Sequence, residues 1–245
     1  MKNLIKAEFF KLFKSTGYRI MLALSVGVGL FFASFAVSHA SRMSGYAVLS
    51  NMVSFVLFHF IFTGSFTAVF LCGEFSDRTM GTGLFCGLPR RSVFLSKLAA
   101  YFAGLLVLLS MVVVVPTVII SKVNGFGIEL TAANNMTILT QIIFFWLVCS
   151  AMGGFFLFLA LATKSAIATI GVGLGIAQSL LVLTSNYVNS GVERYAPAKY
   201  SFVYQMFVLE DWEHLQKGLF LEVSLITLAV TLIASAWIFE RSELK

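Results

Sequence analysis

The sequence predicts an all-α, polytopic membrane protein with six transmembrane helices in a single transmembrane domain, residues 1–245. Three observations predict this class. Apolar residues make up 59% of the chain and charged residues only 11%, against about 25% charged residues in soluble domains. Six apolar blocks each reach the length of about 20 helical residues that crosses a bilayer. None of these blocks holds a lysine, arginine or aspartate near its middle.

The spans are separated by polar segments. They are predicted near residues 18–37, 53–72, 95–120, 141–162, 166–184 and 219–239. The third span contains Pro116, which lacks a backbone donor, so we expect a kink there or the end of the regular helix. Residues 185–218 form a large outer connection rich in tyrosine, phenylalanine and tryptophan. Since these aromatic residues favour the membrane–water boundary, we expect short helices folded back on the outer leaflet.

Residues 1–17 predict an amphipathic helix that lies along the membrane surface. At about 100° per residue, an apolar face and a basic face separate around the helix axis. The apolar face comprises Ile5, Phe9, Leu12 and Phe13, and the basic face comprises Lys6, Lys11 and Lys14. The lysines would lie near anionic headgroups. The alternative is a basic flank that only orients the first span.

The distribution of basic residues predicts a protein of the cell membrane with both termini in the cytoplasm. An even number of spans puts both termini on one side, and 12 of the 17 lysines and arginines then share that side. The positive-inside rule assigns this side to the cytoplasm. The net charge of +6 is not by itself a signal for nucleic-acid binding. We therefore expect the lipid bilayer as a partner, and no nucleic acid.

The segment from Glu74 to Lys97 is the most informative part of the chain. It is a polar, basic and glycine-punctuated stretch between the second and third spans. Ser76 can cap a helix there, and Gly87 followed by Pro89 can end it. We expect a short helix over roughly residues 77–86, which is too short to persist alone in water and needs a packing partner.

This segment resembles the loop after the second span of type-2 ABC transporter permeases from Gram-positive bacteria. Their pattern runs E-F-x-x-G-T, then a short helix, then S-R-R and F-L-S-K. The chain matches it at Glu74, Phe75, Thr79, Arg90, Arg91, Phe94, Leu95, Ser96 and Lys97. It departs from the pattern at Arg78, where glycine is usual, and at Pro89, where serine is usual. The order of a basic amphipathic helix, six spans and a large last outer loop is similar as well.

The resemblance implies a transport subunit rather than an enzyme. It implies a second permease subunit, identical or different, and separate ABC-type ATPase subunits that hold Mg-ATP. Accordingly, this chain has no G-x-x-x-x-G-K-[ST] sequence and needs no cofactor of its own. A coupling helix would contact the ATPase through Asp77, Arg78, Thr79, Met80, Gly81, Thr82, Leu84 and Phe85. The implied substrate is hydrophobic or amphipathic, with an antimicrobial peptide as the best guess, and it would be exported or cleared.

Charged residues flank the coupling segment where the chain meets the membrane. We expect Arg90 and Arg91 at the level of the headgroups. Glu74 lies at the end of the second span, and we expect it to pair with a basic residue of the N-terminal helix or of its own loop, which ends at Lys97.

Three polar residues within the spans are candidates for a substrate path. These are His59, Gln141 and Gln178. Polar groups at membrane depth usually face the interior of a bundle, and the alternative role for each is a hydrogen bond between helices. Gly171 and Gly175 have the spacing of small residues at close helix contacts. Packing within the chain is the expected role of this spacing, and a seam with a second subunit is the alternative.

Two other classes of function remain as alternatives. A secondary transporter driven by an ion gradient usually shows internal repeats and charged residues at the midplane, and neither is evident here. An integral membrane enzyme would need intramembrane carboxylates or clustered histidines, whereas the spans hold only His59. The three cysteines form no C-x-x-C pair and predict neither a metal site nor a disulfide framework.

Overall fold

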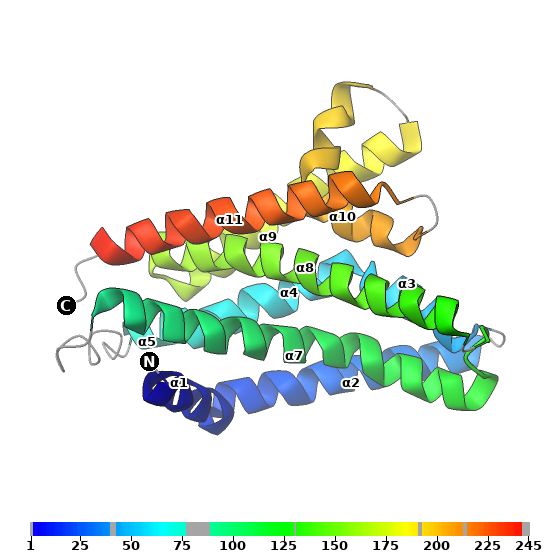
Figure 1. Cartoon of the computed structure of the whole chain (residues 1–245), viewed down its shortest axis with the longest axis horizontal. Helices are drawn as coiled ribbons and strands as arrows, with labels where there is room; N and C mark the ends of the chain where they lie inside the picture. The colour runs from blue at the N-terminus through cyan, green and yellow to red at the C-terminus, as the bar shows by residue number, and fades with distance from the viewer. Residues whose placement is uncertain are drawn as a thin grey trace.

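The chain forms an elongated helical bundle. The computed structural model describes residues 2–39, 43–76, 89–129, 131–190, 193–212 and 215–241. Within these ranges the chain is helical and forms no strand, which confirms the predicted all-α class. Six helices there are long and apolar enough to cross a membrane, which confirms the six predicted spans. Both termini lie at the same end of the bundle (Figure 1).

Each span is longer than its predicted range, although the second begins at Val56 rather than near residue 53. In chain order they are α2 (Thr16–His39), α4 (Val56–Thr67) continued by the π-helical turn η1 (Ala68–Cys72) and α5 (Gly73–Ser76), α7 (Arg90–Asn124), α8 (Ala132–Thr163), α9 (Ala166–Ser190) and α11 (Lys217–Arg241). With 35 residues, α7 is about 52 Å long, so it projects beyond a hydrocarbon core of about 30 Å.

The regular part of α7 does not end at Pro116, so of the two expected outcomes the end of the helix was wrong. The helix continues through Pro116 to Asn124. A helix of this length tolerates one lost hydrogen bond when a neighbour supports it, and α2 packs closely at this level. A Cβ atom on Gly29 of α2 would lie 3.2 Å from the Cδ atom of Pro116. The glycine therefore lets α2 approach α7 beside the proline ring.

Before the first span, α1 (Lys2–Lys14) forms a separate helix against α7. Leu12 is buried beside Gly104 of α7. A Cβ atom added to Gly104 would lie 2.9 Å from the Cδ2 atom of Leu12, so the glycine leaves the space that Leu12 fills. Phe13 is 53% exposed, although the sequence placed it on the apolar face with Leu12. The face of α1 that is buried against the bundle includes Glu8 and Leu12.

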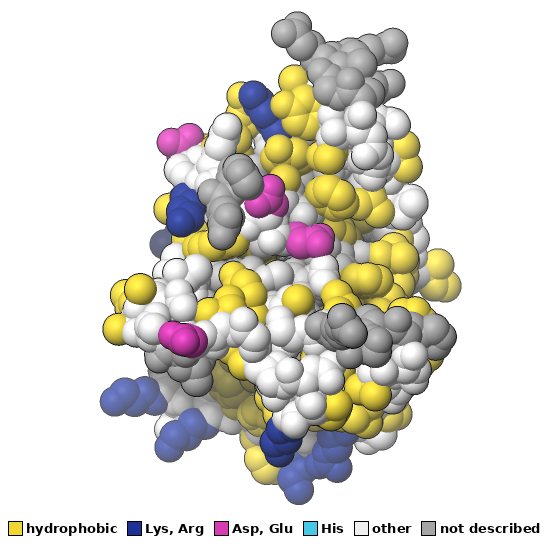
Figure 2. Space-filling model, turned by 90° about the vertical axis from the view of Figure 1, so that its right-hand side faces the viewer, with side chains coloured by type: hydrophobic (Ala, Val, Ile, Leu, Met, Phe, Trp, Pro, Cys, Tyr) yellow, Lys and Arg dark blue, Asp and Glu magenta, His cyan; other side chains and the backbone are white. Residues whose placement is uncertain are grey.

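Short helices cover the end of the bundle opposite the termini. They are α3 (Gly45–Val53), the 3₁₀-helix η2 (Glu193–Tyr200), α10 (Phe202–Phe207) and the 3₁₀-turn η3 (Val208–Glu210). The connection from α9 to α11 packs back on the bundle, because Val203, Met206 and Leu209 are almost fully buried. Figure 2 faces this end and shows acidic side chains scattered among hydrophobic ones.

A polar contact fixes three spans around the π-helical turn. The Tyr101 hydroxyl of α7 lies 2.7 Å from the Thr67 hydroxyl and donates to the Gly153 carbonyl of α8 at 3.0 Å. Thr67 directly precedes η1, where the chain departs from the regular α-helical path. A π-helical turn changes which way the following residues face, and such turns are frequent at functional sites. The first charged residue after η1 is Glu74.

Candidate functional site

Four charged side chains meet where α1, α5 and α7 come together. We name Glu8, Lys11, Glu74 and Lys97 the loop-base cluster. The Lys97 ammonium lies 3.2 Å from a Glu8 carboxylate oxygen and donates a hydrogen bond to Glu74. Lys11 lies 3.3 Å from Glu8 and 3.9 Å from Glu74. Two acids and two bases balance, and this balance allows the Glu8 and Lys97 side chains to be only 4% and 6% exposed.

Glu74 has partners in both of the places that the sequence offered, since Lys11 belongs to α1 and Lys97 ends the loop segment. Glu8 was not predicted to belong to this group of charges, although the sequence contains a signal for it. It is the only acid before Glu74 in the chain, and it falls on the same side of the helix as Ile5 and Leu12. An acid on the apolar face of a basic helix indicates a buried cationic partner.

A second ion pair lies near the loop-base cluster, where the chain enters α7. The Arg91 guanidinium donates to the Glu240 side chain of α11 at 2.8 Å, and Arg90 donates to the Glu240 backbone carbonyl at 2.8 Å. The sequence placed both arginines at the headgroups, and the structure adds that they hold the end of α11. Lys6 and Lys14 are exposed on α1 and take no part in the loop-base cluster.

The predicted coupling residues, from Asp77 to Phe85, lie outside the described residues. What the structure describes is the pair of stems that carry them. One stem is α5, which ends at Ser76, and the other is the start of α7 at Arg90. The loop-base cluster joins these stems to each other and to α1, and Arg91 joins the second stem to α11.

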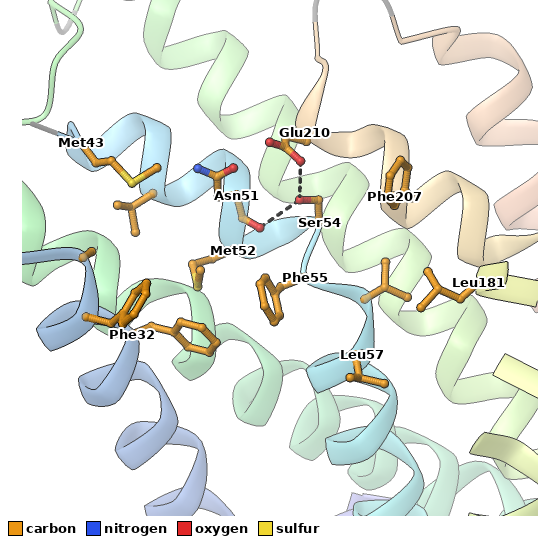
Figure 3. Close-up of a pocket in the computed structure, with 14 residues that line it drawn as sticks. Phe32, Met43, Asn51, Met52, Ser54, Phe55, Leu57, Leu181, Phe207 and Glu210 are labelled. Atoms are coloured by element: carbon orange, nitrogen blue, oxygen red, sulfur yellow. Dashed lines mark hydrogen bonds between the residues drawn. The ribbon is translucent and has the colours of Figure 1, made fainter. Parts of the chain in front are cut away.

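An apolar groove lies near the opposite end of the bundle, between α2, α3, the start of α4, α9, the end of α10 and η3. Its volume is about 610 Å³, within the range of about 300–1,000 Å³ common for ligand pockets. Rings of Phe32, Phe55 and Phe207 line it (Figure 3). At its rim the Ser54 hydroxyl lies 3.3 Å from the Glu210 carboxylate.

His59 and Gln141 lie behind this groove rather than in it. The Nδ1–H group of His59 donates to the Phe55 carbonyl at 2.8 Å, and its ring packs edge-on against Phe145. The Gln141 amide lies within 3.4 Å of the Leu209 carbonyl, next to Glu210 in the chain. Both side chains are fully buried. Gln141 therefore bonds to another element, which is the role that the sequence offered as the alternative, whereas His59 bonds to the residue that begins its own helix.

The outer face of α9 differs from its predicted packing. Gln178 is exposed and lines a second, smaller groove of about 330 Å³. A Cβ atom at Gly171 or Gly175 would meet nothing within 4 Å, so the expected packing of these glycines within the chain was wrong. Gly173, between them, is the glycine that contacts a neighbouring helix, through Phe156 of α8. The contact with α8 therefore lies on a different side of α9 from Gly171 and Gly175.

Comparison with known proteins gives one match. The family model described as ABC-2 family transporter protein matches residues 4–178, from α1 through the loop-base cluster and into α9. No curated protein and no solved structure matches the chain significantly. The match covers well over half of the chain, as the residues around Glu74 and Lys97 suggested. The chain therefore belongs to the ABC-2 transporter family and is a multi-pass membrane permease of the ABC type.

Proposed function

We propose that this permease exports or clears an amphipathic substrate, driven by separate ABC-type ATPase subunits that contact residues 77–85. The single observation that carries the proposal is the loop-base cluster. Both stems of the loop are tied through buried charges to α1. A displacement of the loop would therefore act on α1, α5 and α7 together, and through Arg91 on α11.

The match of the family model supports an ATPase partner, because a permease of this family without a P-loop needs ATP hydrolysis in another chain. A second permease subunit, identical or different, would cover the open face of α9 where Gly171 and Gly175 permit close approach. An amphipathic substrate such as an antimicrobial peptide suits the apolar groove with a polar rim, which opens near the end opposite the termini.

The coupling is tested by replacing Met80 and Leu84 together with aspartate. The tagged variant should lose the ABC-type ATPase that copurifies with the unaltered chain, because two carboxylates would be driven into an apolar cleft. The matched control exchanges the two side chains, Met80→Leu with Leu84→Met, and should retain the ATPase. Mass spectrometry of the purified complexes measures both. An ATPase that still binds the double aspartate variant would contradict the proposal.

The orientation is tested with two reporters fused after Lys245. Twelve of the 17 basic residues predict a cytoplasmic C-terminus. A fused fluorescent protein should therefore fluoresce, and fused alkaline phosphatase should be inactive, because its disulfides form only in an oxidising compartment. Fusion after Met43, behind the first span alone, should give the reverse pattern. Active phosphatase after Lys245 would place the termini outside.

A further inference from the structure

We propose that the apolar groove binds a lipophilic cation, with the Glu210 carboxylate facing the positive charge and phenylalanine rings around the apolar groups. This site deepens the proposed function by naming a charge and a place for the substrate. Only its role in transport rests on that function, since the groove and its charge are features of the chain itself.

The first argument is charge. Glu210 is exposed at the rim of the groove and accepts a hydrogen bond from Ser54. Among the described residues, no lysine, arginine or histidine forms an ion pair with Glu210. Among the residues that the structure describes, the rim therefore carries a carboxylate beside an apolar surface without an ion-pair partner. A positive group would gain the attraction of Glu210 and an anion would be repelled.

The second argument is the kind of apolar surface. The rings of Phe32, Phe55 and Phe58 pack edge to face or tilted, with centroids 5.0 to 5.3 Å apart. Phe35 and Phe55 line the groove and are 54% and 38% exposed. Aromatic faces attract cations, and weakly hydrated organic cations benefit most. Figure 3 shows Glu210 and Ser54 together at one rim, with Phe32 and Phe55 away from it.

The third argument is that buried hydrogen bonds hold the backbone of the groove lining in place. The backbone at Phe55 is held by buried His59, and the backbone beside Glu210 is held by buried Gln141. The two parts of the site come from distant parts of the chain, so these contacts keep the carboxylate and the rings at a fixed separation. Such preorganisation lowers the cost of binding.

The test compares two probe ions of nearly equal size and opposite charge, tetraphenylphosphonium and tetraphenylborate. Equilibrium dialysis against the purified chain in nanodiscs, corrected with empty nanodiscs, should show saturable binding of the phosphonium ion and none of the borate. Glu210→Gln should weaken phosphonium binding by about tenfold, the loss of one close charge interaction. Glu129→Gln, which changes an exposed acid elsewhere on the chain, should leave binding unchanged.

Charge reversal gives the sharper outcome. Glu210→Lys should abolish phosphonium binding and create saturable binding of the borate. Phe35→Ala, at an exposed ring, should weaken binding of the phosphonium ion to the unaltered Glu210 site while the unfolding temperature stays constant. Equal binding of both ions, or phosphonium binding that survives Glu210→Lys, would overturn the site. A lack of saturable phosphonium binding would also overturn the site, and it is the result expected if lipid or a second copy of the chain fills the groove. Loss of ATPase copurification with intact phosphonium binding would instead overturn the coupling and leave the site standing.

Discussion

Replacing Lys97 with methionine should lower the free energy of unfolding by about 3–5 kcal/mol, the cost of removing one partner of a buried ion pair. The Glu8 and Glu74 carboxylates both contact the Lys97 ammonium, and the Glu8 side chain is only 4% exposed. Without Lys97 they would face each other, with only the half-exposed Lys11 beside them. Thermal and denaturant unfolding in detergent, followed by tryptophan fluorescence, would measure the loss.

Two controls separate this effect from a general loss of packing. Adding Glu8→Gln and Glu74→Gln to Lys97→Met removes the uncompensated charges and should restore most of the lost stability. Arg91→Gln removes an ion pair whose arginine side chain is 83% exposed, and it should change unfolding little because water screens that pair. Equal losses in the Lys97 and Arg91 variants would show that the loop-base cluster is not the buried unit described here.

Replacing Gly173 with leucine should destabilise the fold by about 1–3 kcal/mol, the usual cost of overpacking a close-packed interior. The fully buried Phe156 ring of α8 lies between two glycines, Gly64 of α4 and Gly173 of α9. A Cβ atom at Gly173 would overlap the same edge of the ring that lies 2.9 Å from a Cβ atom built on Gly64, so a side chain at Gly173 forces the ring or the helices to shift.

Gly171→Leu is the matched control, because it makes the same change two residues away on the same helix. A Cβ atom at Gly171 meets nothing within 4 Å, and leucine favours a helix over glycine by nearly 1 kcal/mol. The isolated chain should therefore unfold at the same or a slightly higher temperature. Its association with a second permease subunit, measured by crosslinking in membranes, should weaken. Equal destabilisation by both substitutions would contradict the described packing of α9.

The spans and α1 could be predicted because hydropathy and periodicity are local properties of the sequence. The partners of these elements could not, because they depend on how helices face one another. The spacing of Gly171 and Gly175 correctly marks a helix face without bulky groups, but it cannot say whether that face meets the same chain. Only the packed bundle shows that Gly173 meets Phe156 and that its two neighbours in the pattern stay open.

The candidate site, like the fold, could be predicted from the sequence only in part. The loop and its flanking charges are evident from the motif around Glu74 and Lys97, yet the π-helical turn before Glu74 leaves no recognisable pattern in the apolar residues 68–72. His59 and Gln141 attract attention as polar residues in spans, and the sequence cannot show that they hold Phe55 and the segment of Glu210 in place. The groove itself combines residues from six helical elements, so no single stretch predicts it.

The partners Glu8 and Lys97 are separated by 89 residues, and this separation has a consequence for biosynthesis. Glu8 leaves the ribosome long before Glu74 and Lys97 are made, with only the neighbouring Lys11 to balance it. Docking of α1 must therefore wait until the third span has been inserted. Until then the newly made helix would remain at the membrane surface, where lysines can contact headgroups and the carboxylate can stay hydrated. The final closure of the loop-base cluster is thus a late step that reports correct insertion of the first three spans.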